Sequence, residues 1–193
     1  MIKVDARKDP CPTPVIKTKK AIDGLTSADT VEVYVDNETA CENVSKYGKE
    51  VGGQVTCEKC SDNEYKITIK MSEKESREKN KTGSEVVVIS SAVMGQGNDE
   101  LGKVLMKGFI YALTQLDTLP DKILFYNGGA TLTCEGSDSL EDLQFMEKEG
   151  VNIATCGTCL DYYQRKDKLQ VGTVTNMYAI LEAMSTADKI LKP

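Results

Sequence analysis

The 193-residue sequence contains no histidine. This absence excludes Ser-His-Asp and Cys-His catalysis and metal ligation by imidazole, so an activated nucleophile must rely on lysine, arginine, backbone dipoles or a second thiol. No apolar run approaches the roughly 20 residues of a membrane-spanning helix. The first five residues also lack the apolar stretch of a secretory leader. We therefore expect a soluble, cytoplasmic protein without a membrane partner.

A concentration of positive charge is also missing. The formal net charge is -6, and residues 85–193 carry 9 of the 24 basic side chains against 15 of the 30 acidic ones. A nucleic-acid surface normally needs a clustered positive face. We expect no nucleic-acid partner.

Seven cysteines, an odd number, are spread over the whole sequence. In a reducing compartment they remain thiols unless they bind metal or react, so a disulfide framework is not expected. Cys41 falls within an expected helix and is interpreted as a packing residue. Cys57 and Cys60 lie on an expected strand, where positions i and i+3 point to opposite faces. A zinc site shared with Cys156 and Cys159 would join pairs about a hundred residues apart, unlike ordinary structural sites, so neither a metal nor another cofactor is expected.

Residues 1–71 predict the order β-α-β-α-β-β, which is typical of a two-layer α/β sandwich with both helices on one face of the sheet. The elements follow from strand-like alternation, helical periodicity and glycine or asparagine boundaries. Their expected ranges are 2–4, 15–25, 30–35, 38–49, 54–60 and 64–71.

Residues 72–84 contain seven charged side chains and no aliphatic or aromatic one. Such a segment cannot supply a core, so it is interpreted as a solvated linker, with a charged surface helix as the alternative. Thirteen flexible residues span roughly 20 Å, which would give one domain a high effective concentration at the other.

From residue 85 onward, strands alternate with longer helices, which predicts a mostly parallel α/β sheet with helices on both faces. The expected strands are 86–89, 122–126, 151–155 and 189–191, and the expected helices begin near residues 99, 140, 160 and 177. The helix that follows residue 99 is expected to bury a broad stripe consisting of Leu101, Leu105, Phe109, Ala112, Leu113 and Leu116.

Several chemistry-bearing residues follow strands of this second domain. They are the loop at Gly95 and Gly97, Cys134, and the pair Cys156 and Cys159. Ligands of parallel sheets bind at the carboxyl ends of strands, so we expect these residues to share one edge. Gly95 and Gly97 lack the third glycine of a dinucleotide fingerprint, which favours a tight turn over a phosphate site.

One cysteine near the start is enclosed by prolines, in the run Pro10-Cys11-Pro12-Thr13-Pro14. Proline disfavours a helix interior but suits a first helical turn, so we expect Cys11 at or just before a helix N-terminus. The helix dipole and the unpaired N–H groups there favour a thiolate. The alternative is a small buried residue. Lys17, Lys19 and Lys20 follow on the helix as a solvated face, or as groups that dock an acidic partner or favour the thiolate.

These residues carry a family resemblance. Asp5-Ala6-Arg7, then Cys11-Pro12-Thr13-Pro14 and a lysine-bearing helix, resemble the TusA family of small sulfur carriers over residues 1–72. The resemblance implies that Cys11 carries sulfur as a persulfide.

The second domain resembles the DsrE family, which implies a reactive cysteine at Cys156 and a tendency to form homo-oligomers. The fusion, with Met94-Gly95-Gln96-Gly97 and the run that begins at Cys156, resembles YedF proteins, which are associated with selenium metabolism. A cysteine desulfurase or selenocysteine lyase is the implied donor, and selenophosphate synthetase a possible acceptor.

Cys156-Gly157-Thr158-Cys159 has the spacing of a redox motif at a strand-to-helix turn. The hypothesis is that Cys11 accepts sulfur or selenium and passes it by thiol exchange to Cys156, with Cys159 resolving the adduct. Two packed thiols are the plainer alternative. A partner-binding module and a dithiol oxidoreductase that uses Cys156 and Cys159 remain the other candidate functions.

Overall fold

The computed structural model describes residues 1–10, 12–72 and 83–193. The chain divides into two compact units, Met1–Glu78 and Lys79–Pro193. The expected linker at 72–84 falls mostly outside the described residues. Within the described ranges, no helix combines the length and apolarity needed to cross a membrane.

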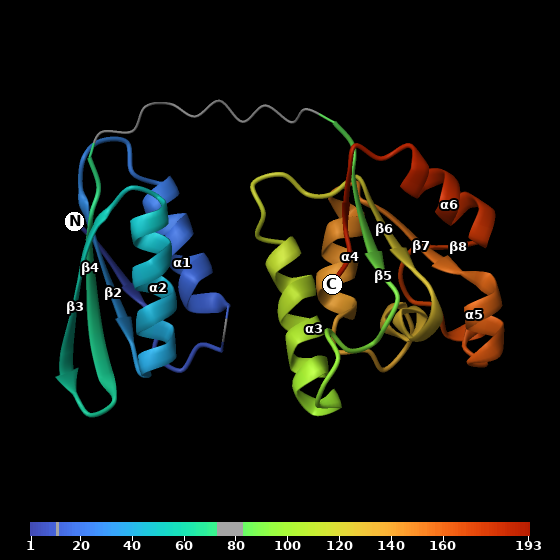
Figure 1. Ribbon diagram of the computed structural model, residues 1–193, viewed down its shortest axis with the longest axis horizontal. Helices are drawn as coiled ribbons and strands as arrows, with labels where there is room; N and C mark the ends of the chain where they lie inside the picture. The colour runs from blue at the N-terminus through green and yellow to red at the C-terminus, as the bar shows by residue number, and fades with distance from the viewer. Residues whose placement is uncertain (11, 73–82) are drawn as a thin grey trace. The chain divides into compact units, whose positions relative to one another are not determined.

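The N-terminal unit is a four-stranded sheet with two helices on one of its faces (Figure 1). Its elements are β1 (Ile2–Asp5), α1 (Thr13–Asp23), β2 (Thr30–Val35), α2 (Glu38–Glu50), β3 (Gln54–Ser61) and β4 (Glu64–Lys70). The strand order is β1-β2-β4-β3; β1 pairs in parallel with β2, and β4 pairs antiparallel with both β2 and β3. The two-layer sandwich predicted from the sequence is confirmed.

Apolar and polar side chains on β2 point to opposite faces of this sheet. Val31, Val33 and Val35 are completely buried in the core with the helices. Glu32 lies between them on the opposite face, where its carboxylate is 2.7 Å from the Lys66 ammonium. That ion pair offsets the free-energy cost of burying the Glu32 carboxylate, since the residue is only 8% exposed.

A disulfide joins Cys41 of α2 to Cys57 of β3. Cys57 pairs across the hairpin with Ile67, so both side chains point to the helix-covered face of the sheet. The expectation that Cys41 is only a packing thiol is wrong, because the helix and strand bring these two sulfurs together. Cys60, at the irregularity between Lys59 and Ser61 of the same strand, is an exposed free thiol.

The C-terminal unit is a five-stranded, fully parallel sheet with the strand order β8-β7-β6-β5-β9. Helices α3 and α4 lie on one face, and α5 and α6 on the other (Figure 1), so the predicted α/β class is confirmed. The elements are β5 (Glu85–Ile89), α3 (Asp99–Leu113), β6 (Lys122–Phe125), η1 (Asn127–Thr133), α4 (Leu140–Lys148), β7 (Asn152–Cys156), α5 (Gly157–Tyr162), η2 (Lys166–Lys168), β8 (Thr173–Thr175), α6 (Met177–Ser185) and β9 (Lys189–Leu191).

The predicted apolar stripe of α3 is wrong at Leu101, Leu105 and Leu116, which are exposed, whereas Leu113 is buried as predicted and Phe109 packs against the core. The buried positions are Gly102, Met106, Ile110 and Leu113, while Leu101 and others of the expected stripe face outward. The helix is apolar on more than one side, so periodicity alone does not select the face that packs on the sheet. Elsewhere in this unit, α5 begins at residue 157 rather than 160, and the short strand β8 was not predicted.

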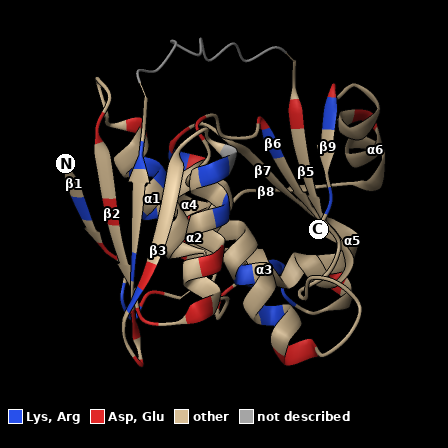
Figure 2. Cartoon of the chain, turned by 60° about the vertical axis from the view of Figure 1, so that its left-hand side comes forward, with Lys and Arg blue, Asp and Glu red and all other residues tan. Residues whose placement is uncertain are grey.

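Charged residues on the strands of this sheet lie at one end. In Figure 2, β5, β6 and β9 are coloured only near their amino ends, where Glu85, Lys122 and Lys189 lie. Glu85 and Lys189 form an ion pair of 2.9 Å. The carboxyl ends of the same strands carry no charged residue.

At this uncharged edge the backbone of η1 packs directly on β5. A Cβ atom added to Gly129 would lie 2.2 Å from the carbonyl oxygen of Ile89. Only glycine fits this close approach, which fixes η1 against the strand.

We expect Gly129→Ala to destabilise the C-terminal unit by about 3 kcal/mol, because backbone must move to admit the methyl group. Gly97→Ala is the matched control, since nothing lies within 4 Å of its added Cβ; it should change stability by less than about 0.5 kcal/mol. Urea unfolding followed by circular dichroism measures both. Equal stability of the two variants would contradict the packing described for η1.

Candidate functional site

The proline-enclosed motif leads into α1 as predicted. Pro12 occupies the N-cap position, Pro14 lies in the first turn, and the Thr13 N–H donates to the Pro10 carbonyl at 2.9 Å. The first turn of α1 contains no acidic residue. Cys11 itself lies outside the described residues, so its role stays a prediction.

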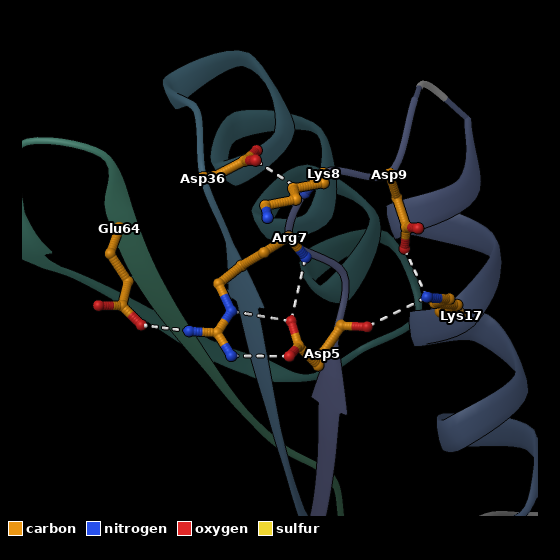
Figure 3. Close-up of polar contacts among 7 residues, drawn as sticks. All are labelled: Asp5, Arg7, Lys8, Asp9, Lys17, Asp36 and Glu64. Atoms are coloured by element: carbon orange, nitrogen blue, oxygen red, sulfur yellow. Dashed lines mark hydrogen bonds and ion pairs between the residues drawn. The ribbon is translucent and has the colours of Figure 1, made fainter.

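Arg7 fastens the start of the loop that joins β1 to α1 (Figure 3). Its guanidinium donates to both carboxylate oxygens of Asp5, at 2.9 and 2.7 Å, and to Glu64 of β4 at 3.1 Å. The hydrogen bonds from Arg7 hold the pKa of the Asp5 carboxyl well below its usual range. The loop is thereby tied to a strand far away in the sequence.

Three further contacts hold the same loop (Figure 3). The Lys8 N–H donates to the Asp36 carboxylate at 2.7 Å, and Lys8 adopts a positive φ of 65°. The Lys17 ammonium lies 2.5 Å from the Asp9 carboxylate and donates to the Asp5 carbonyl at 3.1 Å. Lys17 is thus an anchor of the loop rather than only part of a solvated face, a role that its position on the helix did not reveal.

A small hollow of about 50 Å³ lies beside the loop, between the N-termini of α1 and α2. Pro12 and Asp9 line one side, and Asn37 and Thr39 line the other. Asn37 caps α2 by accepting the Ala40 N–H at 2.8 Å. Two helix N-termini at one hollow favour negative charge there.

The second candidate site lies at the carboxyl end of β7. Cys156 ends that strand and is the N-cap residue of α5, while Cys159 lies in the first turn of α5. Cys159 packs against the apolar cluster that contains Cys156, so the structure places this predicted pair in one region. Cys156 is only 2% exposed, within the core between the sheet and α6, whereas Cys159 is half-buried.

Asn127 contributes a backbone donor from the neighbouring strand end. Its N–H points to the Cys159 sulfur at 3.0 Å, and its side-chain oxygen accepts the Tyr163 hydroxyl at 3.2 Å. Asn127 has a φ of 49°, a left-handed conformation that is uncommon outside glycine. The sequence gives no direct signal for this donor, because it comes from the backbone.

Burial raises the pKa of the Cys159 thiol, and the nearby Cys156 thiol raises it further. The hydrogen bond from the Asn127 N–H acts in the opposite direction and lowers this pKa. The net result is a thiol that ionises less readily than a free cysteine.

Cys134 and Gly95 were also expected at this edge, and their surroundings indicate packing and turn roles. Cys134 is completely buried, and its thiol donates to the Ala130 carbonyl at 3.3 Å. Gly95 has a φ of 80°, which fits the tight turn predicted for its loop. In the ranges that the structure describes, no group of three or more histidine, cysteine, aspartate or glutamate side chains is arranged to hold a metal ion.

Acid should weaken the contacts that hold the loop. The pKa values of Asp5 and Asp36 are lowered in the folded state, by Arg7 and by the Lys8 N–H respectively. Their contribution to stability is complete above the unfolded-state pKa of about 4 and is lost as the pH falls through the folded values. NMR titration of the Asp5 carboxyl in Arg7→Met should show its pKa rising toward the usual value, whereas Lys46→Met, an exposed change on α2, should leave it unchanged. An unmoved Asp5 titration in Arg7→Met would contradict the contact.

Cys159 should react slowly with alkylating agents at neutral pH, because its raised pKa and partial burial limit the thiolate. We expect its rate with iodoacetamide to be at least about tenfold below that of Cys60 at neutral pH and to rise as the pH increases. Peptide mass spectrometry of samples quenched over time measures both sites. Faster alkylation of Cys159 than of Cys60 at neutral pH would disprove this description.

Comparisons with known proteins concern mainly the N-terminal unit. The profile of the family described as "Sulfurtransferase TusA" matches residues 2–71. A "Putative sulfur carrier protein" of Methanocaldococcus jannaschii is 36% identical over 70 residues, which are 36% of this chain and 93% of that protein.

Two solved structures are also similar. The SirA-like protein from Desulfitobacterium hafniense is 32% identical, with a TM-score of 0.36 over 38% of this chain and all of that one. The ychN protein from E. coli is 14% identical, with a TM-score of 0.44 over 57% of this chain and 99% of that one.

The N-terminal unit thus combines the fold, the proline-enclosed cysteine motif and a match that spans nearly the whole length of a relative. Through residues 2–71, this chain belongs to the TusA family.

Proposed function

We propose that the chain is a sulfur carrier that accepts sulfur on Cys11 as a persulfide and relays it to the cysteine pair of the C-terminal unit. The observation that carries this proposal is the family motif at the start of α1, on a loop anchored by Arg7 and Lys17. A carrier thiol must be accessible, and it must be held in a fixed position so that two partners can bind to it one after the other. The ion pairs that hold the flanking loop would fix this position.

The loading step is a thiol exchange. The Cys11 thiolate attacks the outer sulfur of a persulfide on the donor, a new S–S bond forms at Cys11, and the donor cysteine leaves as a thiolate. A cysteine desulfurase is the donor class that generates such a persulfide. The electropositive N-termini of α1 and α2 favour the charged product.

The transferred atom is part of the same proposal. The fusion with a DsrE-like unit resembles YedF proteins, so the cargo is sulfur or selenium, the latter supplied by a selenocysteine lyase and consumed by a selenophosphate synthetase. Selenium would form a selenosulfide at Cys11 by the same exchange. Both units belong to one chain, which raises the effective concentration of one thiol at the other.

The placement of Cys156 and Cys159 at the start of α5, at one apolar cluster, favours a second candidate function, that of a dithiol oxidoreductase. Two thiols at the start of a helix, close enough to interact, are suited to forming a disulfide. This function would reduce small disulfides without any contribution from Cys11.

Incubation of the full chain with a cysteine desulfurase and cysteine should add one sulfur atom to Cys11. Cys11→Ser should lower the sulfur that reaches the C-terminal cysteines, counted as adducts there together with released sulfide, by at least about tenfold, because the relay loses its entry point. Cys60→Ser is the matched control, since it removes another thiol of the same unit. Mass spectrometry of alkylated peptides locates the sulfur. Unchanged loading of the C-terminal pair in Cys11→Ser would refute the relay.

A further inference from the structure

The two cysteines at the carboxyl end of β7 are not equivalent. Cys156 lies in the core formed by the sheet and α6, among side chains that include Ala154 and Ile180. Cys159, one turn later, is half-buried and also receives the Asn127 N–H at its sulfur. A bulky incoming persulfide can therefore approach Cys159 much more readily than Cys156.

We propose that Cys159, rather than Cys156, receives the sulfur, and that Cys156 then expels it as sulfide. This inference reverses the order expected from the sequence. It rests on the proposed function for the source of the sulfur, and it adds the product: the C-terminal unit releases free sulfide rather than handing on a persulfide.

In the first step, the Cys159 thiolate attacks the outer sulfur of the Cys11 persulfide. A new S–S bond forms at Cys159 while the bond to Cys11 breaks. Cys11 leaves as a thiolate and takes up the proton that Cys159 lost. The Asn127 N–H stabilises the attacking thiolate, which partly offsets the effect of burial.

In the second step, geometry decides which sulfur Cys156 attacks. Cys156 is the N-cap residue of α5, is only 2% exposed, and belongs to the apolar cluster against which Cys159 packs. The added outer sulfur needs space, and of the two residues only Cys159 is partly exposed, so we place this sulfur on the solvent side of Cys159. Cys156 therefore attacks the inner sulfur, a Cys156–Cys159 disulfide forms, and the outer sulfur leaves as hydrosulfide with the electron pair of the broken S–S bond.

The reaction oxidises the two thiols and reduces the sulfane sulfur to sulfide, so each turnover leaves a disulfide. A dithiol reductant must restore the pair before the next cycle. A selenosulfide at Cys159 would release hydrogen selenide by the same exchange. At this edge of the sheet, sulfur or selenium would thus be released in reduced form, as sulfide or selenide.

The test uses the full chain with Cys11→Ser and supplies sulfur from sodium polysulfide, which bypasses Cys11. After desalting, alkylation and non-reducing peptide mapping should find a Cys156–Cys159 disulfide, with sulfide trapped by a bimane reagent. Adding Cys156→Ser should leave a persulfide on Cys159 and lower sulfide release at least about tenfold. Adding Cys159→Ser should leave Cys156 unmodified.

Cys60→Ser in the same background is the matched control and should leave the disulfide and the sulfide yield unchanged. Cys156→Ala replaces the serine variant if circular dichroism shows that a hydroxyl disrupts the core. A persulfide on Cys156 in the Cys159→Ser chain, or undiminished sulfide release without Cys156, overturns the proposal. Failure of Cys11 to load from a desulfurase, with the polysulfide result intact, would overturn only the proposed relay.

Discussion

Parallel strand pairing decides where the candidate sites of both units lie. In the N-terminal unit, β1 and β2 run in parallel, so the loop after β1 and the cap of α2 after β2 meet at one edge. The bond from Lys8 to Asp36 joins those two strand ends. In the C-terminal unit, β6 and β7 run in parallel, which brings Asn127 to Cys159. Each site is made of strand ends that are distant in sequence and adjacent in the sheet.

Much of this architecture is readable from local patterns. The alternation of β2, the β-branched run of β5 and the asparagine caps of α2 and α6 each depend on neighbouring residues, and all four elements lie where they were predicted. The face of α3 is different, because its choice depends on which apolar side meets the sheet. The disulfide between Cys41 and Cys57 depends on strand register, which sequence spacing does not encode.

In the candidate sites, too, local features were predictable from the sequence and those that depend on tertiary packing were not. Spacing and the strand-to-helix turn were sufficient to pair Cys156 with Cys159, and the prolines were sufficient to place the start of α1. The difference in burial between the two thiols could not be predicted, since it arises from α6, which packs from far along the chain. Lys17 likewise gained its role from tertiary geometry, because its partners lie on the preceding loop.

The close approach of Gly129 to Ile89 has a consequence for how this protein can change. The donor at Asn127 begins the same short helix as Gly129, and that helix is seated on β5, two strands away from Cys159. Position 129 therefore accepts no side chain. Any sequence that keeps the backbone donor at Asn127 in this place must also keep glycine at position 129, so the tolerance of this edge to mutation is set by the backbone of a neighbouring strand.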